Sequence, residues 1–375
     1  MDFYAEAIAQ AKKLGGKIEI KSKIKIQDKE DLSIAYTPGV AGVSLEIAKD
    51  RSKVWDLTTK ANSVAVVSDG SAVLGLGDIG PEAALPVMEG KCVLFKEFAN
   101  VDAYPIVLNT KSVDEIVSTV SAIASGFGGI NLEDISAPRC FEIEDSLQDL
   151  GIPVFHDDQH GTAIVVLAAL LNSLKVVGKE LDDIKVVIFG AGAAGLAVAR
   201  IINPASIVLI DSKGPINSER KDLNDYKAEI LAGENYLQAS TLEEAFSGAD
   251  VFIGVSGKGK IDQGLIKRMN KKPIIFALSN PDPEIMPEEA KKAGASIVAT
   301  GRSDFPNQIN NVLAFPGIFR GALDNKIKRI DTKIKIKAAD ALAGIVEKPT
   351  SEQILPSPFS KEVVKVVATA VRNYD

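Results

Sequence analysis

The stretch that most constrains the fold is KVVIFGAGAAGLAVARII, residues 185–202. An apolar run leads directly into the pattern G-x-G-x-x-G at Gly190, Gly192 and Gly195, and a run typical of a small-residue helix follows. A second apolar run, SIVLI, ends at Asp211, roughly 20 residues after the first glycine, where a Rossmann fold places an acid. This order of strand, glycine turn, helix and acid predicts a dinucleotide-binding unit with its pyrophosphate at the helix N-terminus. The predicted contacts are Gly190, Gly192, Ala193, Ala194, Gly195 and Asp211.

The same glycine pattern occurs a second time, over residues 75–80. There a turn-like segment, SDGSAVL, separates the glycines from the preceding strand-like run, and Asp78 would bring a negative charge beside the phosphates. The dinucleotide mechanism needs a strand that ends at the first glycine. We therefore interpret the first copy as a close-packed loop or as part of the substrate site.

The identity of the dinucleotide stays open at this point. Asp211 would accept hydrogen bonds from ribose hydroxyls, which mildly favours NAD over NADP because the acid would repel the extra phosphate. Lys213 follows closely and would offset that repulsion. Both cofactors are therefore kept.

The whole chain alternates between strand-like and helical patterns, which predicts an α/β fold with largely parallel sheets. A length of 375 residues suggests two domains, at roughly 150 residues each. A long apolar helix over about 161–177 marks the boundary. We predict an N-terminal α/β substrate domain over 1–156, and a doubly wound Rossmann domain with C-terminal helices over 157–375.

The N-terminal segment carries its own pattern. Residues 3–14 have helical spacing, and KIEIKSKIKI, residues 17–26, then alternates lysine and isoleucine with the period of a strand. Alternation of this kind is typical of a solvated or edge strand.

Charge and cysteine content limit the class of protein. A net charge of -7 and a pI near 5.2 argue against a general nucleic-acid or anionic-membrane surface. No apolar run reaches the roughly 20 residues that a membrane span needs, and the N-terminus has no signal-peptide pattern. The two cysteines, Cys92 and Cys140, are few for a chain of this size and indicate a reducing compartment. We expect a cytoplasmic protein that acts on a small molecule.

Both histidines of the chain, His156 and His160, lie in PVFHDDQHGTA, whose spacing is similar to the zinc motif H-E-x-x-H. A zinc helix needs both histidines one turn apart on an established helix. Here the extended run PVF precedes His156 and Gly161 follows His160, so the stretch is a helix entrance. We do not expect the two rings to share one metal.

Carboxylates are better candidates for a metal site. Glu133 and Asp134 follow the apolar run GGINL, and Asp157 and Asp158 follow GIPVF. Carboxylates at two strand ends suit a hard ion such as Mg²⁺ or Mn²⁺. The alternative is that they are solvated loop acids together with a helix N-cap.

Several ordered motifs carry a resemblance to one family. YTPGVA, DGSAVLGLGDIGPEAALPVMEGK, INLEDISAP, FHDDQHGTA, VVIFGAGAAG, ALSNPDPE and NNVLAFPGIFRGAL together resemble malic enzyme in its short prokaryotic form, from about Tyr36 to Leu323. The resemblance implies metal-dependent oxidative decarboxylation of L-malate to pyruvate and CO₂ with reduction of NAD⁺ or NADP⁺. It also implies a homodimer, with the possibility of a catalytic residue that crosses the interface.

The resemblance assigns roles residue by residue. It implies Mn²⁺ or Mg²⁺ ligands at Glu133, Asp134 and Asp158, with Asp157 in support. It implies Lys91 as the base for the C2 hydroxyl and Tyr36 as the acid for C3, and substrate and nicotinamide contacts at Asn280 and Asn311.

One position departs from the family pattern. Longer members have an arginine within the segment that matches DGSAVLGLG, and this arginine helps to bind the malate carboxylate. The aligned residue here is Ala72. How this chain holds that carboxylate is left open.

Two other functions remain from the residues alone. A metal-free dehydrogenase of similar architecture, acting for example on amino acids or folates, would need neither acid pair. A dinucleotide-sensing regulator would keep the Gly190 loop without chemistry.

Overall fold

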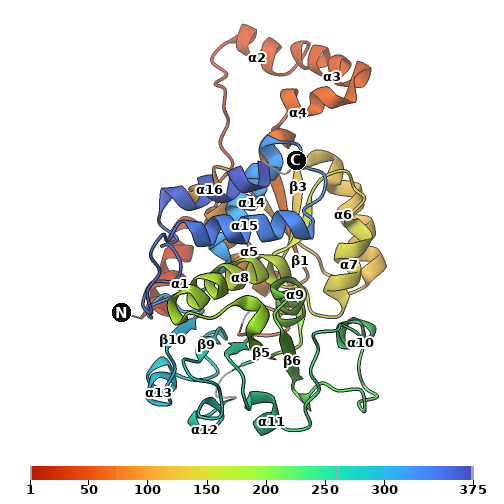
Figure 1. Cartoon of the computed structure of the whole chain (residues 1–375). Coiled ribbons are helices and arrows are strands. Elements are labelled where there is room, and N and C mark those ends of the chain that lie inside the picture. Colours follow the sequence, from red (N-terminus) through yellow and green to blue (C-terminus); the bar gives the residue numbers. More distant parts are fainter. Residues whose placement is uncertain (1, 74, 258–260, 373–375) are drawn as a thin grey trace.

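The computed structural model describes residues 2–73, 75–257 and 261–372. Its described part holds two sheets (Figure 1). The first has the order β2-β1-β3-β4 and all of its pairs are parallel. Its strands are β1 (Ser63–Ser68), β2 (Asp102–Val107), β3 (Gly129–Leu132) and β4 (Val154–His156).

The second sheet has the order β10-β9-β8-β5-β6-β7, and only the short β7 runs antiparallel to its neighbour. With β5 in the middle, the chain winds first toward β6 and then returns to β8 on the other side. Ligands of such sheets bind beyond the carboxyl end of the strand at which the winding reverses. The predicted α/β fold with a Rossmann unit is confirmed. The strands are β5 (Lys185–Phe189), β6 (Ser206–Asp211), β7 (Gly214–Pro215), β8 (Val251–Gly254), β9 (Ile274–Ala277) and β10 (Ile297–Thr300).

Helices cover both sheets. In the first half they are α1 (Phe3–Leu14), α2 (Lys29–Ala35), α3 (Gly39–Lys49), α4 (Val54–Leu57), α5 (Pro81–Ala99), α6 (Val113–Ile123) and α7 (Arg139–Leu147). The second half contains α8 (Asp157–Val177), α9 (Ala193–Ile202), α10 (Asp225–Leu231), α11 (Leu242–Phe246), α12 (Gln263–Ile266), α13 (Pro287–Lys292), α14 (Phe315–Asp324), α15 (Thr332–Gly344) and α16 (Lys361–Arg372). The 3-10 helices are η1 (Arg51–Lys53), η2 (Thr59–Asn62), η3 (Ala124–Gly126), η4 (Leu181–Asp183) and η5 (Asn311–Leu313).

Helix α8 is the central core helix. It packs on α9 and α15, and most of its residues are buried. By length and composition it is the one helix of the described residues that is able to cross a membrane, but 72% of its apolar window is buried inside the protein. Its apolar character is therefore explained by the core. Its side chain Asn172 donates to the carbonyls of Ala343 and Ile354, both at 2.9 Å, which ties the C-terminal region to this helix.

The C-terminal helices return to the first half of the chain, and Figure 1 shows α14, α15 and α16 beside α5 and α8. Phe315 and Phe319 of α14 pack against Phe95 of α5, with ring centroids 4.7 and 5.3 Å apart. Arg320 donates to Asn62 Oδ1 at 2.6 Å. The predicted division at residues 156 and 157 stays a prediction, because the last helices pack on elements from both sides of it.

The predicted strand over residues 17–26 is wrong. These residues form no strand, and their four isoleucines are 41 to 87% exposed. An alternating pattern needs a neighbouring strand to become a sheet edge, and this segment has none within the described chain. It leads instead to α2 and α3, which stand away from the body in Figure 1.

Candidate active site

Two strand ends bring the predicted acids together. Strands β3 and β4 are parallel neighbours, with Leu132 opposite His156, so the residues after them emerge at the same edge of the sheet. One oxygen from each of Glu133, Asp134 and Asp158 lies within 4.8 Å of the others. Asp134 has a left-handed φ of 53°, and its N–H donates to Asp158 Oδ2 at 2.8 Å. The backbone thus fixes the spacing of the cluster.

The cluster has the chemistry of a site for a divalent ion. Burial raises the pKa of each of the three carboxyls, and neighbouring carboxylates add to the effect. Asp134 Oδ2 is buried without a hydrogen-bond partner among the described residues. Three converging carboxylates that repel one another fit a hard cation such as Mg²⁺ or Mn²⁺, which would satisfy the oxygens and offset their charge.

Lys91 contacts the acid cluster through Glu133. Its Nζ is 2.6 Å from Asp157 Oδ2 and 2.8 Å from Glu133 Oε1, and it sits 4.3 Å from the centre of the Phe315 ring. Burial acts to lower the pKa of Lys91, but the two carboxylates outweigh it and raise the pKa well above its usual value. The lysine thus lies within ion-pair distance of two buried acids.

Asp157 holds this arrangement in place. Besides Lys91, its Oδ2 accepts from Asn311 Nδ2 at 2.6 Å, and a Cβ at position 161 would lie 1.8 Å from its Oδ1. Gly161 is therefore required by the close approach of the carboxylate. The supporting place predicted for Asp157 agrees with these contacts, although its role in catalysis stays a prediction.

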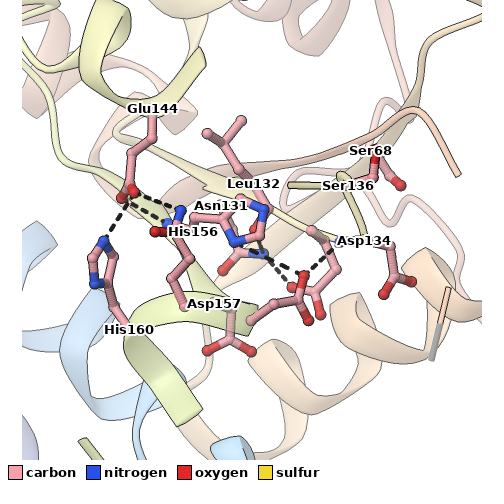
Figure 2. Close-up of polar contacts among 12 residues, drawn as sticks. Ser68, Asn131, Leu132, Asp134, Ser136, Glu144, His156, Asp157 and His160 are labelled. Carbon is pink, nitrogen blue, oxygen red and sulfur yellow. Dashed lines mark hydrogen bonds and ion pairs between the residues drawn. The ribbon is translucent and has the colours of Figure 1, made fainter. Parts of the chain in front are cut away.

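The histidines have a different partner, which the sequence interpretation missed. Glu144 of α7 accepts from the His156 backbone N–H at 3.0 Å and from Gln159 Nε2 at 3.0 Å, and its Oε2 is 2.9 Å from His160 Nε2. Figure 2 shows Glu144 between the two histidines. His156 is the N-cap residue of α8 and His160 lies within the helix, so the predicted helix entrance is observed. The metal-binding geometry among the described residues belongs to the carboxylates.

A cavity of about 680 Å³ connects the predicted sites. Its lining includes Asp134 and Asp158 from the acid cluster, the glycine loop over residues 192–194, and the predicted contacts Asn280 and Asn311. A nucleotide on the loop and a small substrate at the acids would therefore share one space.

The glycines of the second motif differ in what they permit. Gly190 has a φ of +124°, and a Cβ on Gly195 would lie 1.7 Å from the Gly190 carbonyl oxygen, so these two allow the tight turn and close helix packing. A Cβ on Gly192, the N-cap of α9, would meet nothing within 4 Å, and Gly192 lines the cavity. The open approach that a pyrophosphate needs is therefore at Gly192.

We expect Gly192→Val to weaken NAD(P)H binding by more than about tenfold, roughly 1.4 kcal/mol, because the side chain would fill the approach to the helix N-terminus. The melting temperature of Gly192→Val should differ little from that of the wild type. Gly195→Val is the matched variant and should lower the melting temperature. Calorimetric titration of folded Gly192→Val with NAD(P)H tests the placement, which fails if the affinity is unchanged.

Asp211 ends β6 as predicted, but basic residues surround it. Its two oxygens accept from Arg220 at 2.7 and 3.0 Å, from Lys227 Nζ at 2.7 Å and from the Lys213 N–H at 2.9 Å. Partial burial acts to raise the pKa of Asp211, but the hydrogen bonds from Arg220 and Lys227 outweigh it and lower the pKa to about 2. A ribose hydroxyl would have to compete with these donors, so the predicted role of Asp211 as ribose acceptor stays a prediction. The sequence interpretation missed Arg220 and Lys227.

Tyr36 is not brought to this site within the chain. It is the C-cap residue of α2, its exposed fraction is 67%, and it lies in the segment that projects from the body in Figure 1. The first glycine motif, by contrast, does reach the cavity. Gly75 lines it, and a Cβ there would be 2.8 Å from the Asn280 carbonyl oxygen. This loop thus closes against the loop that carries Asn280.

Fold and site together define a two-domain class of oxidoreductase, in which a Rossmann dinucleotide loop faces, across one cavity, a cluster of carboxylates whose spacing could hold a metal ion. Family models for the NAD-binding domain of malic enzyme match residues 159–374, and those for its N-terminal domain match 15–112 and 108–148. The chain belongs to the malic enzyme family, whose members oxidise and decarboxylate malate with NAD or NADP.

Individual relatives match over most of their length. The bifunctional malic/malolactic enzyme of Bacillus subtilis is 54% identical over 99% of this chain and 92% of its own. The NAD-dependent malic enzyme of Geobacillus stearothermophilus is 55% identical over 96% of this chain and 76% of its own. The crystal structure of the NAD-dependent malic enzyme of Thermotoga maritima superimposes with a TM-score of 0.94 at 48% identity, covering 98% of this chain and 99% of that one.

Proposed function

We propose that this chain catalyses the oxidative decarboxylation of L-malate to pyruvate and CO₂, with Mn²⁺ or Mg²⁺ at Glu133, Asp134 and Asp158 and with NAD⁺ or NADP⁺ as hydride acceptor. The observation that carries the proposal is the single cavity whose lining joins two of these acids to the glycine loop and to Asn280 and Asn311. Substrate and nicotinamide would meet there.

The side chains divide the work in this proposal. A divalent ion supplies Lewis-acid polarisation of the substrate oxygens. Lys91 lies against Glu133 of the cluster and is the candidate to exchange a proton with the C2 hydroxyl. Asp157 keeps the lysine in place and is itself fixed by Asn311. The backbone at Gly192 would hold the pyrophosphate in the cavity that Asn280 also lines.

The basic residues around Asp211, at the end of β6, support the use of NADP⁺ alongside NAD⁺. Arg220 and Lys227 already saturate the oxygens of Asp211, so the acid contributes less repulsion toward a ribose phosphate than its sequence position suggests. The same two cations are suitable partners for that phosphate.

We also propose that the active protein is a homodimer whose sites are completed by Tyr36 of the partner subunit. The segment over residues 17–49, which leads into α2 and α3 and includes them, carries a group of exposed apolar side chains, and such a group is typical of a protein interface. Those side chains are Ile18, Ile20, Ile24, Ile26, Leu32, Ile34, Val40, Val43 and Leu45. Tyr36 lies among them at 67% exposure, which suits a residue that docks on a second copy.

We also propose a cytoplasmic location, because the chain has few cysteines. The two cysteines are free and buried, which agrees with a reducing compartment.

The direct test is absorbance at 340 nm with L-malate and Mn²⁺, offering NAD⁺ and NADP⁺ in separate assays. We expect reduction of the nucleotide, release of pyruvate and complete loss of activity on adding EDTA. Activity that survives EDTA would favour a metal-free dehydrogenase. Tight NAD(H) binding without turnover of malate would favour a nucleotide-sensing regulator.

A further inference from the structure

Over the residues that the structure describes, the lining of the cavity offers no positive charge to one end of the substrate. Among its described lining residues, the ionisable side chains are Asp134, Asp158 and Asp282, and none is a lysine or arginine. Malate carries two carboxylates. A divalent ion held by the acid cluster would offset the charge of one of them, so the other carboxylate needs a donor of its own when it leaves water.

Arg139 lies just outside this lining. It is the first residue of α7, and its Nη1 is 2.8 Å from Asp69 Oδ2, whose side chain is fully buried. Its Nη2 donates to two hydroxyls, Ser71 Oγ at 2.8 Å and Ser136 Oγ at 3.0 Å. The guanidinium is therefore held rigidly by four neighbours, the fourth being the Lys111 carbonyl.

Ser71 and Ser136 differ in whether the hydroxyl proton has an acceptor. Ser71 Oγ donates to Asp69 Oδ1 at 2.6 Å and accepts from the Ser136 N–H at 2.9 Å, so its hydroxyl is fully used. Ser136 Oγ accepts from Arg139, and within the described residues its own proton has no acceptor. Ser136 lines the cavity, two residues after Asp134. Its hydroxyl is thus a donor that is polarised by a cation and available to a ligand.

We propose that Ser136 donates this hydrogen bond to the malate carboxylate remote from C2, and that Arg139 is the positioning residue that orients and polarises the hydroxyl. The inference rests on the proposed malate activity. It also explains how this chain could bind a malate carboxylate with alanine at position 72, where longer family members have an arginine. The Ala72 N–H donates to the Asp134 carbonyl at 2.9 Å, so the segment that lacks an arginine is pinned beside the serine that Arg139 supports.

The test compares two ligands of the same site. Malate has the remote carboxylate, whereas oxalate offers adjacent oxygens to a metal ion and has no remote carboxylate. In Ser136→Ala we expect the KM for malate to rise about 10- to 100-fold, the range for losing a hydrogen bond to a charged group, with kcat changed by less than about threefold. The inhibition constant of oxalate with Mn²⁺ should stay within about twofold of wild type, as expected for a ligand that does not use the lost donor.

Arg139 is tested with the same readouts. Arg139→Gln should reproduce the rise in KM for malate without weakening oxalate, and Arg139→Lys, which restores the charge but not the planar fork, should recover part of it. Arg302→Gln is the matched control. Arg302 also donates to a lining residue, the Pro281 carbonyl at 3.1 Å, but its other nitrogens pair with Asp304. This variant should behave as wild type.

Three results would overturn the inference: an unchanged malate KM in folded Ser136→Ala, an equal loss for malate and oxalate, or an effect that follows Arg302 instead of Arg139. These outcomes are distinct from failure of the proposed function. In that case the wild-type protein itself would not oxidise malate.

Discussion

Asp158→Ala is expected to abolish Mn²⁺-dependent malate oxidation and to reduce Mn²⁺ affinity by more than about 100-fold, beyond the 10- to 100-fold cost typical of residues that only orient metal ligands. Asp158 supplies one of three clustered oxygens and also accepts the Asp134 N–H at 2.8 Å. Its loss would therefore remove one proposed ligand and release the loop that positions a second one. Calorimetric titration with Mn²⁺ measures the metal affinity independently of turnover.

His160→Ala is the matched control for this prediction. His160 contacts Glu144 and is not part of the carboxylate cluster, so folded His160→Ala should retain most of its Mn²⁺ affinity. It should nevertheless unfold at lower temperature, because Glu144 loses one of its partners while buried. If the histidine variant loses the metal and the aspartate variant keeps it, the carboxylate assignment is wrong.

The parts of the site that were predictable from sequence are those fixed by strand order. Glu133 and Asp158 each follow an apolar run, and parallel strands deliver such residues to the same edge of a sheet, so their convergence follows from local patterns. The Gly190 loop was predictable for the same reason, since strand, glycines and helix are contiguous. Both predictions depend only on short-range order.

The parts that were not predictable depend on pairs of residues far apart in the chain. Arg139 meets Ser71, 68 positions away, and Lys91 meets Asp157, 66 positions away, and no periodicity marks either pair. Lys91 was assigned by resemblance alone. At Asp211 the position was predicted correctly, but its cationic partners come from the following loop and from α10. The alternation over residues 17–26 predicted a strand wrongly, because a strand also needs a neighbouring strand to pair with.

A dimer assembled from two inactive variants is expected to regain activity. Lys91→Ala should slow malate oxidation by roughly 10² to 10⁴, and Tyr36→Phe should leave the metal site intact while removing the acid that protonates C3. If Tyr36 serves the partner's Lys91, a heterodimer of the two variants contains one intact site and one site that lacks both groups. Its activity should therefore be about half that of the wild-type dimer.

The measurement uses co-expression with two different affinity tags and purification over both, so that only heterodimers are assayed. Removing Lys91 leaves Asp157 and Glu133 without their buried cation, so Lys91→Met, which keeps the aliphatic stem, is assayed beside Lys91→Ala to separate folding from chemistry. Tyr36→Phe alone should still decarboxylate oxaloacetate but convert enolpyruvate to pyruvate no faster than buffer. A heterodimer no more active than either parent would place both groups in the same chain, and α2 would then have to fold back onto α5 from the exposed position that it occupies in Figure 1.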